Sequence, residues 1–195
     1  MFFLSKPPAK TVESLLMERQ AMSFSYPDVG ATRRMPPPGW PTNHMRAPLG
    51  TGRRIFVKSV EALFSWRLLA LDGLEVFPSS APAEAERVVG ILSRHLGIWS
   101  VDFCRVIYVL QGAREDNDLL RTGFAYGTLP GHALRGEELF SLEWHSRTEQ
   151  VWYDIFSFSL PANPLVRLAS PVARAAQKRF ARASLDQAIR LARDA

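Results

Sequence analysis

The sequence has little cysteine and no long apolar run. Cys104 is the single cysteine among 195 residues, so an intrachain disulfide is excluded, and its place inside an apolar stretch predicts a buried thiol. The opening MFFLSK is too short for a signal-peptide core, and no later run approaches the roughly 20 apolar residues of a membrane helix. These absences predict a soluble, cytoplasmic protein without a transmembrane segment.

Motifs for metal, phosphate and nucleic-acid chemistry are also missing. The histidines are scattered and neither HExxH nor a cysteine pair occurs, so we expect no metal and no cofactor. Glycines beside Arg53 and Arg54 at the start of an expected helix could hold an anion. The stretch is neither a dinucleotide fingerprint nor a phosphate loop, so a plain helix cap is the simpler interpretation. The lack of a nucleic-acid motif argues against specific nucleic-acid binding.

Length and hydrophobic content predict one domain over residues 1–195. With 47% hydrophobic residues, the chain is long enough for one well-buried core and short for two. The net charge of +5 is uneven, because residues 160–195 carry seven basic and two acidic side chains. Arg174, Lys178 and Arg182 follow at intervals of four, which predicts a basic stripe on one helix face. The stripe is either a solvated face or a contact for an anionic surface.

Three helical patterns flank a run of strands. The first segment, residues 1–50, starts with a short amphipathic helix and continues as a proline-rich chain that wraps the domain. A second helix is expected over residues 51–70, with Thr51 placed to cap it. A C-terminal helix is expected over residues 164–193, with a bend or restart at Pro171.

From residue 73 to residue 159 the pattern changes to the period of two that is typical of strands. The expected strands are residues 74–77, 87–94, 104–111, 121–129, 137–145 and 151–159. Their links are too short for a crossover helix, so neighbours should pair antiparallel as a meander. We therefore predict an α+β fold, in which a curved antiparallel sheet of about six or seven strands is covered by a long C-terminal helix. The expected cover is apolar: Leu168, Val172, Phe180 and Leu185.

Several motifs resemble those of a known family. They are YPDVGATR at 26–33, PPGW at 37–40, LGTGRRIF at 49–56, GFAYGTLPGHALRGEELF at 123–140, VWYDIFSFSLPANPLVRL at 151–168 and QKRF at 177–180. Together they look like the signature of the domain-of-unknown-function family nineteen-ninety. Leu160 stands where that family more usually has an arginine. The resemblance implies a shared fold, of START-like helix-grip architecture with a space between sheet and helix, and it implies no activity.

The stretch richest in chemically active side chains is the hairpin over residues 123–145. Its candidate acid/base groups are Tyr126, His132, Glu137 and Glu138. Burial beside aromatic residues would raise the pKa of a carboxyl group towards neutrality, where it can act as an acid or a base. The alternative is a glutamate at the end of a hairpin that binds backbone amides.

Aromatic residues along the strands predict either a packed core or the wall of an apolar ligand pocket. The candidate ligand-binding residues are Trp40, Trp99, Tyr108, Phe124, Tyr126, Gly127, Trp144 and Trp152. Gly127 lies on the less bulky face of its strand, where it either keeps a cavity open or allows close approach of the terminal helix.

Three functional hypotheses follow. The leading one is a domain that binds a small hydrophobic or amphipathic molecule in a cavity between the sheet and the C-terminal helix. The second is an enzyme that acts on such a molecule by acid/base chemistry. The third is an interaction module that uses Arg174, Lys178 and Arg182 on an anionic surface.

Overall fold

The computed structural model describes residues 1–194 except residues 96, 117 and 169. The strands are β1 (Phe2–Phe3), β2 (Thr42–Thr51), β3 (Leu74–Phe77), β4 (Val88–His95), β5 (Ile98–Asp116), β6 (Leu119–Thr128), β7 (Leu134–His145) and β8 (Gln150–Pro161). The helices are α1 (Ala9–Arg19), α2 (Arg53–Phe64), α3 (Pro164–Leu168) and α4 (Ser170–Arg193), with a 3-10 turn, η1 (Ala31–Arg33), between α1 and β2. Within the described residues, no helix is both long enough and apolar enough to cross a membrane.

The sheet is an antiparallel meander, as the strand periodicity predicts. Its strand order is β2-β8-β7-β6-β5-β4-β3, and β1 pairs with β5 beside this path. All six expected strands are present, so the α+β prediction of a curved antiparallel sheet with a C-terminal helix is confirmed. The pairing of β5 with β6 shifts register at several points, and such bulges bend and twist a sheet.

Two strands are missing from the prediction: the two-residue β1, and β2, which lies in the segment expected only to wrap the domain. Pro48 lies inside β2 opposite Trp152, and the register shifts between Pro48 and Gly50. Proline cannot donate to a strand ladder, but β2 is an edge strand, where one side of the backbone needs no partner strand. The prolines therefore did not exclude a strand here.

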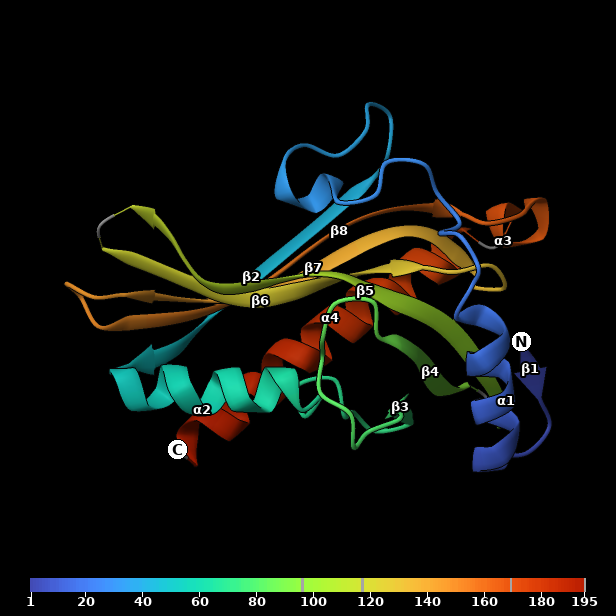
Figure 1. Cartoon of the computed structure of the whole chain (residues 1–195), viewed down its shortest axis with the longest axis horizontal. Coiled ribbons are helices and arrows are strands. Elements are labelled where there is room, and N and C mark those ends of the chain that lie inside the picture. Colours follow the sequence, from blue (N-terminus) through green and yellow to red (C-terminus); the bar gives the residue numbers. More distant parts are fainter. Residues whose placement is uncertain (96, 117, 169, 195) are drawn as a thin grey trace.

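Both faces of the sheet are covered by other parts of the protein (Figure 1). The helices α2 and α4 lie against one face, which we call the inner face. On the opposite, outer face lie α1 and the segment between α1 and β2. The inner core contains fully buried Phe124, Phe140 and Tyr153 together with Leu63 and Trp66 from α2 and the turn that follows it. The strands thus present two buried faces instead of one.

Both expected helix starts differ in detail. Thr51 ends β2 and does not cap α2, whose N-cap is Gly52 with φ 104° and no side-chain hydrogen bond. The terminal helix consists of α3 and α4, and Pro171 lies in the first turn of α4, where a missing amide hydrogen costs little. The expected cover is only partly correct, because Leu168 is 83% exposed while Leu185 is 7% exposed. Phe180 is partly buried, and the side chain of Val172 is outside the described part of the structure.

The two leucines give a matched test of how the terminal helix covers the sheet. Leu185→Ala should lower the free energy of unfolding by about 2–4 kcal/mol, because it removes a buried side chain and leaves a cavity. Leu168→Ala should change it by less than about 0.5 kcal/mol, because that side chain is exposed. Urea denaturation of both variants measures the difference, and equal losses would contradict this packing.

Candidate functional site

Two neighbouring glutamates on β7 lie on opposite faces of the sheet. Because successive strand residues alternate between faces, Glu137 points to the outer face and Glu138 to the inner face. Both are buried, with 3% and 8% of their surface exposed, respectively. A buried carboxyl group needs hydrogen-bond donors or must stay protonated, and the two residues meet this requirement in different ways.

Glu137 is fully satisfied by the segment that crosses the outer face. It accepts hydrogen bonds from the Tyr26 hydroxyl at 2.9 Å, the Gly30 amide at 2.7 Å and the Thr32 amide at 3.0 Å. The Thr32 hydroxyl also donates to it. These donors come from the motif YPDVGATR at residues 26–33, so one purpose of that motif is to bind Glu137. This arrangement matches the alternative in which a hairpin-end glutamate binds backbone amides.

Gly127 lies beside the segment that hydrogen-bonds to Glu137 and not beside the terminal helix. It pairs with Glu137 across β6 and β7. A Cβ atom at this position would lie 2.3 Å from the Tyr26 hydroxyl oxygen and 3.0 Å from a ring carbon of Phe24. Gly127 therefore allows the outer segment to approach closely, which differs from both alternatives predicted from the sequence.

Among the described residues, Glu138 has a single hydrogen-bond donor. The Tyr126 hydroxyl donates to its Oε2 at 3.0 Å, whereas its Oε1 is buried and has no hydrogen-bond partner among the described residues. Burial raises the pKa of Glu138 to about 7, and the hydrogen bond from Tyr126 opposes this shift only in part. Burial also raises the pKa of Tyr126, so its hydroxyl stays protonated and remains the donor.

Glu138 belongs to a row of polar side chains that crosses four strands on the inner face. Strand register places Asn43 of β2 opposite Ser157 of β8, Ser157 opposite Glu138, and Glu138 opposite Tyr126 of β6. We call these four residues the inner polar row. The Gln177 side chain of α4 donates to the Ser157 hydroxyl at 3.2 Å, so α4 lies over this row. The side-chain nitrogen of Asn43 is buried and has no partner in the described part of the chain.

Helix α4 packs tightly against the inner face only along its C-terminal half. Ala181, Leu185, Ala188 and Ala192 are buried against the sheet. Nearer the start of α4, Gln177 and Phe180 contact the sheet but are only partly buried. The inner polar row therefore lies under the less tightly packed half of the helix.

The predicted site residues do not all meet in one place. Phe124, Tyr126 and Trp144 lie on the inner face, where Phe124 packs against Trp66 with ring centroids 5.0 Å apart and Trp144 stacks on Phe56 of α2. Gly127 and three of the aromatic candidates lie on the outer face: Trp40, Tyr108 and Trp152.

Trp99 also lies on the outer face, but away from Glu137, and His132 lies in a turn. Trp99 packs with the α1 cluster, and Lys6 lies over its ring at 5.5 Å. His132 is in the turn between β6 and β7, where its Nδ1 accepts from the Leu134 amide at 2.9 Å. Of the four acid/base candidates, only Tyr126 and Glu138 meet on the inner face.

Three members of this site were missed by sequence reasoning: Asn43, Ser157 and Gln177. Ser157 and Gln177 lie inside the motifs at 151–168 and 177–180, whereas Asn43 lies in none of the quoted motifs. The placement of Asn43 follows from the pairing of β2 with β8. The available signal was the alternation of residues 43–49, in which Asn43, Met45, Ala47 and Leu49 share a face. This pattern reads as a strand once proline is allowed at a sheet edge.

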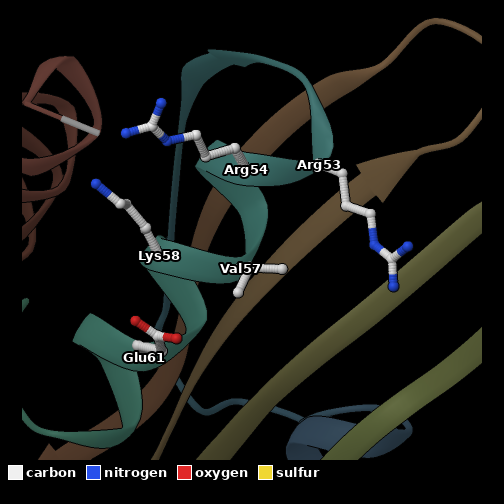
Figure 2. Close-up of a pocket in the computed structure, with 5 residues that line it drawn as sticks. All are labelled: Arg53, Arg54, Val57, Lys58 and Glu61. Atoms are coloured by element: carbon white, nitrogen blue, oxygen red, sulfur yellow. The ribbon is translucent and has the colours of Figure 1, made fainter.

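Three basic side chains of α2, Arg53, Arg54 and Lys58, line one surface pocket together with Val57 and Glu61. Figure 2 shows a shallow surface pocket on α2 in which Arg54 and Lys58 extend to one side and Arg53 to the other. Arg174, Lys178 and Arg182 are exposed on α4, as the stripe prediction requires. Among the residues that the structure describes, no group of three or more His, Cys, Asp or Glu side chains is placed to hold a metal ion.

A curved antiparallel sheet, a C-terminal helix across its inner face and polar side chains between them define a helix-grip domain. The chain belongs to the family described as Domain of unknown function (DUF1990), whose model matches residues 25–187. A UPF0548 protein of Dictyostelium discoideum is 31% identical over 206 residues, covering 97% of this chain and 95% of that protein. A UPF0548 protein of Deinococcus radiodurans is 33% identical over 201 residues, covering 93% and 94%.

A solved structure supports the fold assignment. A hypothetical protein from Helicobacter pylori matches with a TM-score of 0.51, covering 80% of this chain and 90% of that chain. The sequence identity is 14%, so this likeness concerns the fold alone.

The adjacent glutamates should respond in opposite ways to the same substitution. Between pH 4.5 and about 7, the unfolded chain releases the Glu138 proton while the folded protein keeps it, so stability falls as the pH rises. Each pKa unit corresponds to about 1.4 kcal/mol, so this loss amounts to about 3 kcal/mol. Glu138→Gln should abolish the loss and stabilise the protein near pH 8.

Glu137→Gln is the matched control. It turns an amide donor towards the donors of Tyr26, Gly30 and Thr32, and it should cost about 2–4 kcal/mol at both ends of the pH range. Urea denaturation near pH 5 and pH 8 measures both variants. A Glu138→Gln protein with unchanged pH dependence would refute the raised pKa of the buried carboxyl group.

Proposed function

We propose that this protein binds a small amphipathic molecule between its sheet and the less tightly packed half of α4. The observation that carries the proposal is the buried Glu138 Oε1, which has no hydrogen-bond partner among the described residues. An unsatisfied buried polar atom costs about 1–3 kcal/mol, and a ligand that supplies its partner recovers this cost. The carboxyl group is therefore better explained as part of a binding site than as part of a packed core.

The surroundings of Glu138 fit the two halves of an amphipathic molecule. Its neighbours in the inner polar row supply hydroxyl and amide groups, which orient a polar end. Phe140, two residues along the same face of β7, packs edge to face with Phe180 of α4 at 6.3 Å between ring centroids. An apolar body would lie against these rings. Phe180 is partly exposed, so this side of the helix also supplies the route of entry.

An enzyme acting on the same molecule is the alternative. A carboxyl group with a pKa of about 7, hydrogen-bonded to the Tyr126 hydroxyl, suits proton transfer near neutral pH. The candidate acid/base pair is then Tyr126 and Glu138, without His132 or Glu137. Only this alternative requires turnover, and only it predicts that a substrate accumulates when the gene is deleted.

A neutral fluorescent probe tests the binding site. N-phenyl-1-naphthylamine should bind the full-length protein with an increase in fluorescence, because the probe is apolar and carries one amine donor. Gln177→Trp should weaken this binding at least about tenfold, because the larger side chain occupies the space over Ser157.

The matched control for this experiment is Arg179→Trp. Arg179 is exposed on the same helix, so the substitution adds the same side chain outside the site and should leave the affinity unchanged. Thermal melting confirms that both variants are folded. Equal binding by the Gln177→Trp protein would place the probe elsewhere and count against the proposal.

A contact with an anionic surface is a second candidate function. Arg174, Lys178 and Arg182 are exposed, and no ion pair with an acidic side chain is found for them in the described part of the chain. If the stripe binds a membrane, the protein should bind vesicles rich in phosphatidylserine and dissociate as salt is raised. The triple change of these residues to glutamine should reduce binding at least about tenfold. Unchanged binding in vesicle sedimentation would show that these three residues do not form the membrane contact.

A further inference from the structure

The inner polar row leaves two buried atoms without a partner in the described structure, and the two have opposite hydrogen-bonding character. The side-chain nitrogen of Asn43 can only donate, whereas Oε1 of Glu138 can accept. Both residues project from the same face of the sheet towards α4, at one level along the strands. Two unsatisfied groups at one level indicate two contacts to one molecule.

The positions of these groups set the length of that molecule. Asn43 is on β2 and Glu138 is on β7, and β8 lies between those strands. Neighbouring strands are about 4.8 Å apart, so the two backbones are separated by roughly 10 Å. Ser157, midway along the row, already receives a hydrogen bond from Gln177. A molecule that reaches both ends must therefore extend across β8 and needs no strong polar group in its middle.

The row offers no counterion for an anionic ligand. Its members are Asn43, Ser157, Glu138 and Tyr126, and none of them is basic. A ligand carboxylate at the Asn43 end would be buried without a cation, which is costly. An uncharged acceptor, such as a ketone or amide carbonyl, avoids this cost.

We infer that the ligand is an elongated molecule without an anionic group, with a carbonyl acceptor at one end, a hydroxyl or amine donor at the other, and an aromatic or alicyclic body between them. The acceptor binds the Asn43 amide and the donor binds Glu138, so these two residues set the specificity of the site. This inference rests on the proposed function, because it describes the ligand of the same site.

Three probes that share one body separate the two contacts. They are 6-hydroxy-2-acetonaphthone, which carries both polar ends, 2-naphthol, which carries only the donor, and 2-acetonaphthone, which carries only the acceptor. Titration calorimetry on the full-length protein should show the two-ended probe binding at least about tenfold more tightly than either one-ended probe. This is the gain expected when a buried polar atom receives its partner.

Two variants assign each end to its residue. Asn43→Leu, which has a similar volume and no donor, should remove the advantage given by the acetyl group and leave the affinity for 2-naphthol unchanged. Glu138→Met should remove the advantage given by the hydroxyl group and leave the affinity for 2-acetonaphthone unchanged. In each variant the unaffected probe shows that the site is intact.

The results distinguish this inference from the proposed function. If N-phenyl-1-naphthylamine binds at the Gln177 site but the two-ended probe does not bind, or binds no better than the one-ended probes, the inference is wrong and the proposed function stands. The inference would also be wrong if the two variants changed the affinities for all three probes in the same way. If none of the four probes binds, the proposed function fails, and the inference fails with it.

Discussion

The carboxylate of Glu137 is the interaction on which the outer layer of this protein depends. The chain between α1 and β2 has little regular structure of its own, apart from the short η1 turn. Backbone amides and hydroxyls of residues 26–32 instead converge on one buried side chain of the sheet. Neither partner is stable alone, because a buried carboxylate requires donors and buried amides require acceptors. A single side chain thus fixes a long irregular segment, and Gly127 provides the space in which it fits.

Strand geometry links the outward position of Glu137 to the residue that faces the inner core. With Glu137 on the outer face, its neighbour must face α4, whatever residue it is. An apolar side chain there would pack into the inner core at no electrostatic cost, and it would stabilise the fold more than a carboxyl group with one donor. Glu138 therefore lowers the stability of the fold, so stability does not explain its presence. Two other buried polar atoms on this face have no partner in the described part of the chain: the side-chain nitrogen of Asn43, which lies in the same row, and Nε1 of Trp144, which lies outside it.

Much of the fold could be predicted because strand periodicity is a local signal. Alternation is clear in residues 124–129, whereas residues 106–110 form a short apolar run, and all six predicted strands were found. β2 was not predicted, because Pro48 reads as a strand breaker until the position at the sheet edge is known. The misplaced cover residue Leu168 has a similar cause. Helical spacing shows which residues share a face, but it does not show where α3 ends and α4 begins.

The candidate site was predictable only where it is local. Tyr126 and Glu138 belong to one hairpin, so their meeting follows from the register of β6 with β7. Asn43 and Gln177 reach the same place from β2 and α4, which are distant in sequence and are positioned by tertiary packing. The aromatic candidates were divided between two faces because both faces are covered, and an aromatic strand residue then packs equally well on either side.

The edge position of β2 has a consequence for how copies of this protein meet one another. An unpaired edge strand is a template on which another chain can add, and this leads to aggregation. Here Pro48 removes one amide donor from that edge, the adjacent register shift distorts its ladder, and Arg46 is charged and exposed. At the opposite edge, β3 is only four residues long. Both open ends of the meander are therefore poor templates, so the sheet can stay open without recruiting a further strand.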